Sequence, residues 1–257
     1  MDTLRKVPPY HVLASIYDVV MSHVNYRAWA THVVHLIKQF ASGATRVHEL
    51  GCGTGNFTFA LYEAGSFKHV SGSDSSEAMI QQARTKAHRH HLPLSFYVMD
   101  FRQPHLHEQV DVAILVYDGL NYLLDESEVL QTLTNLASFV RPGGVFIFDT
   151  STPANSLNNA GLFEDIGRVG NTHYIRRSAY DPASHLHRTW FLIEQDGHRY
   201  LEEHVERAYT MEEIMQTIAQ SPFKLEAAYH ELTTRPASPD SERIHWILRC
   251  PEPSSGL

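Results

Sequence analysis

The spacing of the hydrophobic positions predicts that strands and helices alternate along residues 45–150. Short apolar runs are followed by segments in which apolar residues recur at helical spacing. The run at residues 110–116 is almost entirely apolar, which is typical of a parallel strand covered on both faces. We predict strands at residues 45–50, 69–73, 94–99, 110–116 and 145–148, and helices at residues 57–64, 77–89 and 125–140.

The segment before this alternation is predicted to be mainly helical. Apolar residues recur at roughly helical spacing across residues 10–40, and Ser42 with Gly43 ends the second helix. Because strands and helices alternate afterwards, the connections are predicted to be right-handed βαβ units around a parallel sheet. The predicted fold class is therefore α/β, with a Rossmann-like, doubly wound and mostly parallel sheet.

The alternation breaks after residue 150. Residues 151–170 are rich in Asn, Gly and Ser and predict loops, and the strands that follow are separated by turns that begin with Asp. This predicts a small antiparallel insertion, after which Thr210 caps another helix and two strands return to the main sheet. The predicted strands lie at 173–180, 186–194, 199–209, 224–232 and 243–250, the helix at 211–219, a frayed tail at 251–257, and the two domains at 1–150 with 208–257 and at 151–207.

Composition narrows the class of protein. The 257 residues are 43% hydrophobic with a net charge of −8, which excludes disorder and argues against a general nucleic-acid binder. We find no secretory signal and no apolar run of about 20 residues, so we expect no membrane span. Two cysteines form no disulfide framework, and eighteen histidines show no metal-ligand spacing. We therefore expect a metal-free, soluble protein of the reducing cytoplasm.

Acidic residues follow the predicted strands where each strand ends. Asp74, Asp100, Asp118 and Asp149 all occupy such positions. Because ligands of parallel α/β sheets bind at the carboxyl ends of the strands, these side chains are expected to gather at one edge of the sheet.

The strongest chemical signal is the glycine-rich turn at residues 49–56, Glu-Leu-Gly-Cys-Gly-Thr-Gly-Asn. Glycines between a strand and a helix permit positive φ and close approach of a ligand, and the helix N-terminus offers free N–H donors. A dinucleotide site needs a third glycine where Asn56 stands, and a P-loop needs a Gly-Lys-Ser/Thr that is absent from the sequence. Asp74, at the end of the next strand, suits the two hydroxyls of a ribose.

Four motifs in order give a resemblance to the class I S-adenosylmethionine-dependent methyltransferases. The turn at residues 49–56 resembles the family's first motif, and Gly72–Met79 and Met99–Phe101 resemble the second and third. Arg141–Gly144 resembles the turn before the fifth strand. Looser similarity at residues 16–29, 118–123 and 206–209 indicates a bacterial subgroup with small-molecule substrates, sugar N-methyltransferases among them.

The resemblance implies S-adenosyl-L-methionine as cofactor and a role for each matching position. Gly51, Cys52 and Gly53 would face its methionine moiety, and Asp74 would hold the ribose hydroxyls. The family's second motif usually has an apolar residue after its acid, whereas Ser75 here would add a polar contact or cap the helix. The remaining implied positions are Met79, Asp100 and Phe101 at the adenine, Tyr17, Tyr26 and Trp29 closing over the cofactor, and Tyr117 near the sulfonium.

Methyl transfer needs alignment and exclusion of water, and it needs a base only when the acceptor is protonated at working pH. Tyr117, Asp118 and Asn121 are the catalytic candidates near the expected cleft, with His173 on the insertion. The insertion is expected to form an acceptor lid for a small molecule, with neither nucleic acid nor membrane as partner. Its exposed edge could pair subunits, so a homodimer stays open.

Three alternatives remain on sequence alone. An NAD-dependent oxidoreductase is disfavoured by Asn56, and a nucleic-acid methyltransferase by the acidic charge and by the Val116–Gly119 sequence at the end of the fourth strand. A non-catalytic regulator that binds the cofactor is the third. The acceptor itself, and transfer to nitrogen or to oxygen, cannot be read from the motifs.

Overall fold

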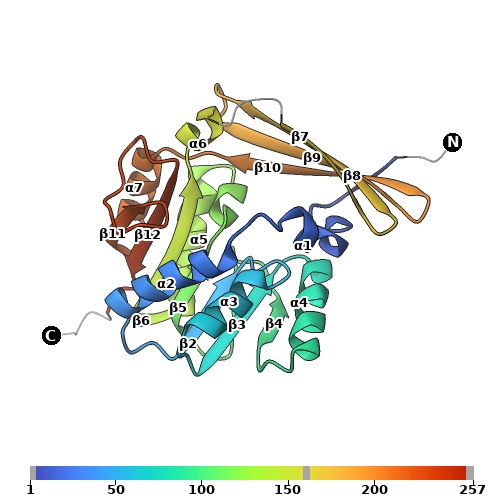
Figure 1. Cartoon of the computed structure of the whole chain (residues 1–257). Helices are drawn as coiled ribbons and strands as arrows, with labels where there is room; N and C mark the ends of the chain where they lie inside the picture. Colours follow the sequence, from blue (N-terminus) through green and yellow to red (C-terminus); the bar gives the residue numbers. More distant parts are fainter. Residues whose placement is uncertain (1–3, 159–162, 253–257) are drawn as a thin grey trace.

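The computed structural model describes residues 4–158 and 163–252, which form two β-sheets (Figure 1). The larger sheet has the strand order β11-β12-β6-β5-β2-β3-β4. Its strands are parallel except β12, which runs antiparallel to both neighbours. The strands are β2 (Arg46–Leu50), β3 (His69–Asp74), β4 (Ser95–Val98), β5 (Val110–Leu115), β6 (Val140–Ser151), β11 (Lys224–His230) and β12 (Arg243–Arg249).

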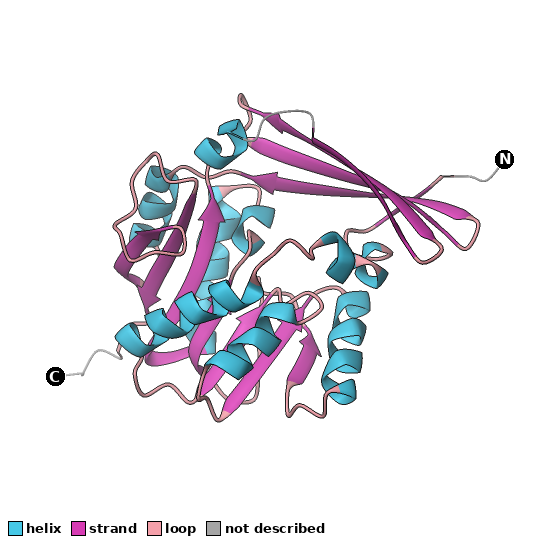
Figure 2. Ribbon diagram, viewed as in Figure 1, coloured by secondary structure: helices cyan, strands magenta, loops and turns pink. Residues whose placement is uncertain are grey.

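Helices cover both faces of this sheet, as Figure 2 shows. Ser76, Asp125 and Thr210 each accept a hydrogen bond from a backbone N–H of the helix that follows, which confirms the three predicted helix starts. The helices are α1 (Tyr17–Val20), α2 (Tyr26–Phe40), α3 (Asn56–Ala64), α4 (Glu77–Arg89), α5 (Glu126–Phe139), α6 (Pro153–Asn158) and α7 (Met211–Gln220), with short 3₁₀ turns η1 (Leu13–Ser15) and η2 (Gly119–Tyr122).

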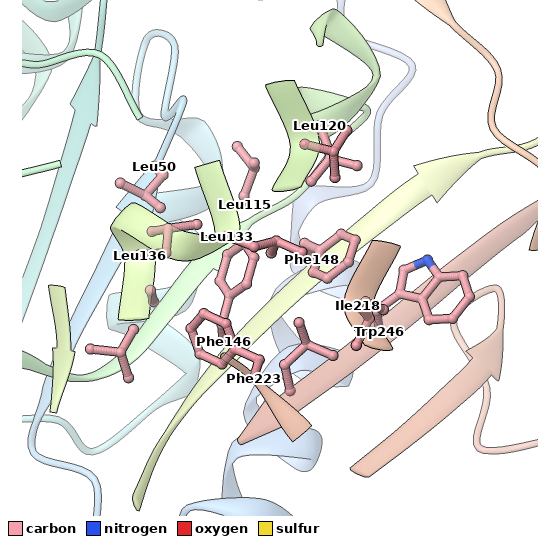
Figure 3. Packing of buried hydrophobic residues seen from close by; sticks show 14 of the residues in the cluster. Leu50, Leu115, Leu120, Leu133, Leu136, Phe146, Phe148, Ile218, Phe223 and Trp246 are labelled. Carbon is pink, nitrogen blue, oxygen red and sulfur yellow. The ribbon is translucent and has the colours of Figure 1, made fainter. Parts of the chain in front are cut away.

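The core lies on the two faces of the larger sheet. On one face α5 and α7 pack over the aromatic side chains of β6 and β12, among them Phe146, Phe148 and Trp246 (Figure 3). On the other face α2 and α3 pack over β2, β5 and β6. The predicted α/β class with a Rossmann-like, mostly parallel sheet is confirmed.

The second sheet has the order β1-β10-β9-β8-β7 and lies over the carboxyl ends of the larger sheet's strands (Figure 1). Four of its strands come from the predicted insertion, and the fifth comes from the N-terminus and pairs in parallel with β10. Apolar residues of the N-terminal segment, such as Leu13 and Ile16, pack on this sheet. The strands are β1 (Arg5–Val7), β7 (Phe163–Val169), β8 (Thr172–Asp181), β9 (Leu186–Gln195) and β10 (His198–Arg207).

Three predictions of local structure were wrong. The strand predicted at 145–148 extends from Val140 to Ser151, because Gly143 and Gly144 exchange hydrogen bonds with Cys250 and so continue the pairing past Pro142. The loops predicted at 151–170 contain α6 and β7. The helical segment predicted at 10–40 is divided into η1, α1 and α2.

The predicted frayed tail comprises residues 251–257, and from residue 253 onward it lies outside the described residues. None of the described helices is both long and apolar enough to cross a membrane.

Candidate functional site

A cavity of about 690 Å³ lies where the strands β2, β3 and β5 end, under the N-terminal segment. The predicted ligand positions, which are scattered over a hundred residues of sequence, all line it. They are Tyr17, Tyr26, Trp29, Gly51, Cys52, Gly53, Asp74, Ser75, Met79, Asp100, Phe101 and Tyr117.

The glycine turn forms the floor of this cavity. Gly51 and Gly53 have φ of 62° and 52°, the left-handed region that side chains disfavour. The Asp74 carboxylate accepts hydrogen bonds from the backbone N–H of Gly53 at 2.9 Å and of Ser76 at 2.8 Å. Burial raises the pKa of Asp74, and these two N–H groups oppose the rise. Since a carboxylate can accept about four hydrogen bonds, two oxygens remain able to receive a pair of ligand hydroxyls.

Glu49 is a second buried acid of the cavity, and the sequence predictions did not include it. It lies at the end of β2, 3% exposed, and accepts a hydrogen bond from the hydroxyl of Thr58. Burial raises its pKa to about 8, more than the Thr58 bond lowers it. A cationic group bound in the cavity would favour the ionised form of Glu49.

The N-terminal segment is fastened to the glycine turn by a polar network. Asp18 of α1 accepts hydrogen bonds from the Thr54 hydroxyl at 2.6 Å and from the Asn56 side-chain amide at 2.9 Å. Lys86 of α4 donates to both Asp18 and Asn56. Asn56 therefore adds to the direct Lys86–Asp18 link between α4 and α1, and a third glycine would lack both of its contacts.

Glu202 fastens the same segment to the second sheet. Its fully buried carboxylate on β10 accepts hydrogen bonds from the backbone N–H groups of Tyr10, Val12 and Leu13 at 2.7, 2.6 and 2.9 Å. Ser76 adds a bond from its hydroxyl to the Tyr10 carbonyl. Tyr10 is therefore held at the wall of the cavity by the second sheet and by the residue that caps α4, and no sequence motif pointed to it.

Asp100 and Met79 occupy the far wall of the cavity. The Asp100 carboxylate is engaged by the guanidinium of Arg102 at 2.6–3.0 Å, which lowers its pKa against the effect of burial. Met79 is 1% exposed in the first turn of α4. This wall thus places the apolar side chain of Met79 next to the carboxylate of Asp100, which accepts hydrogen bonds from Arg102.

A second cavity of about 220 Å³ adjoins the first, between the larger sheet and the inner face of the second sheet. The catalytic candidates Tyr117, Asp118 and Asn121 all line it, whereas His173 is exposed and lines neither cavity. The residues that the two cavities share are all tyrosines: Tyr10, Tyr17, Tyr117 and Tyr122.

Backbone strain concentrates at this boundary. Tyr10, Tyr117 and Asp118 have φ of 61°, 66° and 66°, values that non-glycine residues rarely adopt. The strain at Tyr117 and Asp118 is held by Asp149, whose carboxylate accepts from the Tyr117 N–H at 2.6 Å.

Arg243 of β12 joins the ends of β5 and β6, and the sequence predictions missed it. Its guanidinium pairs with Asp149 and, at 2.6 Å, with Asp118. It also lies over the rings of Trp29 and Tyr117, 5.2 and 5.7 Å from their centroids. Burial raises the pKa of Asp149 to about 6, and Arg243 opposes the rise. Asp118 is thus held in place as one partner of a buried ion cluster.

Asn121 is committed to the backbone. Its amide donates to the carbonyls of Ser151 and Arg207 at 2.9 and 2.7 Å and accepts from the Ser151 N–H at 3.1 Å. The side chain thereby joins the end of β6 to the end of β10. In the second cavity, the Asn121 side chain therefore sets the distance between the two sheets.

Glu49 opens the quoted glycine-rich turn, so its motif could have drawn attention to it, whereas the other missed residues had no motif. Glu202, Tyr10 and Arg243 acquire their partners from segments more than sixty residues away. For Arg243 the signal that could have drawn attention was a charged residue opening a mainly apolar predicted strand. Among the described residues no group of three His, Cys, Asp or Glu side chains is placed to hold a metal ion.

Comparison with known proteins gives the domain type. Residues 47–144 match a family model described as a methyltransferase domain. Over 249 residues, 93% of this chain and 99% of the other, the sequence is 28% identical to a protein of Geobacillus sp. (strain WCH70) that is provisionally named a methyltransferase.

Solved structures agree in fold. The S-adenosylmethionine-dependent methyltransferase from Clostridium acetobutylicum ATCC 824 matches with a TM-score of 0.78 at 22% identity, over 93% of this chain and 98% of that one. The sugar N-methyltransferase KedS8 from Streptoalloteichus sp ATCC 53650 matches with a TM-score of 0.72 at 17% identity, over 96% of this chain and 94% of that one.

Proposed function

We propose that this chain, a class I S-adenosylmethionine-dependent methyltransferase, transfers a methyl group to nitrogen or oxygen of a small-molecule acceptor. The resemblance inferred from the motifs is confirmed by the domain match and the shared fold. The observation that carries the acceptor side of the proposal is the adjoining pair of cavities with four tyrosines between them.

The larger cavity is the proposed cofactor site. S-adenosylmethionine carries an ammonium, a ribose diol and a sulfonium, and the cavity offers a complement to each. Glu49 is a buried carboxyl without a described cation beside it, suited to the ammonium, and Asp74 has free acceptor capacity for the diol. Aromatic faces at Tyr17, Tyr26, Trp29 and Tyr117 attract a sulfonium.

The cofactor supplies an activated methyl group, and the protein supplies alignment and a site closed to water. The shared tyrosines mark the path along which the methyl group passes. Burial raises the pKa of Tyr10, Tyr17 and Tyr122, so their hydroxyls remain protonated and act as hydrogen-bond donors. Tyr117, Asp118 and Asn121 shape the acceptor side of this junction and hold it rigid.

The size of the second cavity supports a small acceptor. At about 220 Å³ it suits a molecule no larger than a single sugar or amino acid, and its lining comes from the second sheet, η2, the N-terminal segment and α6. The competing dinucleotide function is disfavoured by Asn56, whose side chain is used to link Asp18 and Lys86.

The test combines binding with turnover. Calorimetry of the purified protein with S-adenosylmethionine should show one site, and incubation with a panel of small amines and alcohols should release S-adenosylhomocysteine. Product mass should rise by one methylene unit. An intact fold by circular dichroism without cofactor binding would contradict the cofactor site. Methylation of nucleic acid or protein, with every small acceptor untouched, would contradict the acceptor class.

A further inference from the structure

The second cavity has a charged side built from one face of the second sheet. Side chains of an antiparallel sheet that share a face recur every second residue. The register pairs Arg176 with Phe191, His187 with Glu206, and Thr189 with His204, and these residues all line the cavity. None of them falls in the glycine-loop motifs that identify the cofactor site.

Arg176 is held so that only the edge of its guanidinium is free. Its central carbon lies 5.0 Å from the ring centroid of Phe163 and 5.7 Å from that of Phe191. Its Nε is buried and has no hydrogen-bond partner. A buried guanidinium N–H without an acceptor is costly, and the fork of donors at its edge matches a carboxylate or a phosphate.

Glu206 faces the cavity from β10. Arg243 is already shared by Asp118 and Asp149, and among the described residues neither Glu206 nor Arg176 belongs to an ion pair. Burial raises the pKa of Glu206 to about 8, and Asp118 adds to the rise. The Tyr122 hydroxyl, Arg243 and Arg176 oppose it, and His187, whose own pKa is lowered by burial, stands opposite on β9.

The tyrosine boundary lies next to Glu206. The hydroxyls of Tyr10 and Tyr122 are hydrogen-bonded to each other, and that of Tyr122 is 3.0 Å from Nδ1 of His204. Glu206 raises the pKa of both tyrosines, which places its carboxyl in their electrostatic range. The cavity thus offers a proton acceptor, Glu206, beside the tyrosines that the two cavities share. It also offers a cation, Arg176, whose Nε has no hydrogen-bond partner in the described part of the chain.

We propose that the methyl acceptor carries an anionic group, a carboxylate or a phosphate, which binds the edge of Arg176 while Glu206 receives the proton of its amine or hydroxyl nucleophile. This rests on the proposed function. The nucleophile's lone pair forms the new bond to the methyl carbon as the sulfur–methyl bond breaks, and that bond's electron pair passes to sulfur. The nucleophile's proton goes to the Glu206 carboxylate, so charge and atoms balance.

The first test uses matched acceptor pairs that differ only in the anionic group. Suitable pairs are β-alanine with propylamine, phosphoethanolamine with ethanolamine, glycerate with glycerol, and glucosamine 6-phosphate with glucosamine, assayed by S-adenosylhomocysteine release. We expect kcat/KM to favour the anionic member by about tenfold or more, as for a charge-assisted hydrogen bond. Equal rates within pairs would overturn the proposal, and the carboxylate and phosphate pairs distinguish the two anion sources.

Two arginine variants isolate the anion contact. Arg176→Gln should raise KM for the anionic acceptor about tenfold or more with kcat little changed. Arg177→Gln is the matched control, because Arg177 is the next residue on β8, is exposed on the opposite face and pairs with Glu164. In the product complex with S-adenosylhomocysteine, ¹⁹F NMR should detect trifluoroacetate bound by wild type and by Arg177→Gln but not by Arg176→Gln. Equal binding by all three proteins, or by none of them, would overturn the proposal even if no acceptor of the panel reacts.

Glu206→Gln tests the proton acceptor. We expect kcat to fall about 100-fold. With a hydroxyl acceptor, the rise of kcat/KM with pH, centred near pH 8 in the wild type, should disappear, while trifluoroacetate binding persists. An unchanged pH profile in the variant would remove Glu206 from the proposal. Calorimetry with S-adenosylmethionine distinguishes the two failures: if wild type binds no cofactor, the proposed function fails, whereas cofactor binding with no preference for anionic acceptors contradicts only the anionic-acceptor site at Arg176 and Glu206.

Discussion

The seven-stranded sheet is covered by helices on both faces, whereas the five-stranded sheet covers the N-terminal segment with one face and leaves part of the other exposed. Phe148 in the first is fully buried, and Ile166 in the second is 67% exposed. The cavity at the first sheet is formed largely by turns at strand ends. One side of the cavity at the second is formed by side chains that project from the strands themselves, and the N-terminal segment and η2 line the other side.

This difference matches the two halves of the proposed reaction. A cofactor that is the same in every family member can be held by a fixed backbone turn and a few acids. An acceptor that differs between enzymes is better matched by side chains on a sheet face, where single substitutions alter the charge and leave the backbone pairing intact. The second sheet therefore carries the proposed specificity, and the first carries the proposed cofactor chemistry.

The largest expected effect contrasts the two packing environments. Phe148→Ala should lower the free energy of unfolding by about 3–5 kcal/mol, because it opens a cavity between β6 and α7, and Ile166→Ala should change it by about 0.5 kcal/mol or less. Urea denaturation measures both. Similar losses in the two variants would show that the exposed face of the second sheet is covered in solution.

The next effect tests how the second sheet holds the N-terminal segment. Glu202→Ala leaves three backbone N–H groups near Tyr10 without their acceptor and should cost roughly 3 kcal/mol. Hydrogen exchange at residues 10–13 should accelerate, and cofactor affinity should fall because Tyr10 lines both cavities. Glu202→Gln keeps one acceptor oxygen and serves as the milder control. Unchanged exchange in Glu202→Ala would mean that apolar packing alone holds the segment.

Asp74→Ala tests the cofactor half. The variant should bind S-adenosylmethionine more weakly by about 1.5–3 kcal/mol, the range for hydrogen bonds to a charged group. Calorimetry gives the dissociation constant, and Asp181→Ala, at an exposed turn between β8 and β9, should leave it unchanged. If both variants bind equally well, Asp74 does not hold the ribose.

The smallest effect concerns His48, which lies in the centre of the larger sheet between the hydroxyls of Ser71 and Ser73 at 2.8 and 2.9 Å. Burial lowers its pKa from 6.5 to about 3, so between these values the unfolded chain binds a proton that the folded chain does not. Stability from this group is therefore lost as pH falls below 6.5, by about 1.4 kcal/mol per pH unit.

The variant His48→Asn isolates this effect, since the neighbouring Glu49 has a raised pKa and acts in the opposite direction. Unfolding free energies of both proteins between pH 6.5 and 5 should differ in slope by the stated amount. Parallel pH dependences would contradict a neutral, buried His48.

The sequence by itself determined the elements of the larger sheet and the residues at its edge. Apolar runs, helix-capping residues and the glycine turn act within a few positions of one another, so their physics is local and readable. The turn at Gly51 and Gly53 and the acid at Asp74 follow from that, and all twelve residues predicted around the cofactor line one cavity.

Only the tertiary structure decided which charged side chains of the second sheet line the second cavity. Arg176 and Arg243 look like ordinary charged residues on predicted strands, and Glu206 had only a loose family similarity. The role of all three depends on which strand they face. The strand register of the second sheet, the N-terminal strand that joins it and the Glu202 contacts bring together groups nearly two hundred residues apart. Burial and pairing at such distances arise from folding, because no local spacing encodes which buried charge will find a partner.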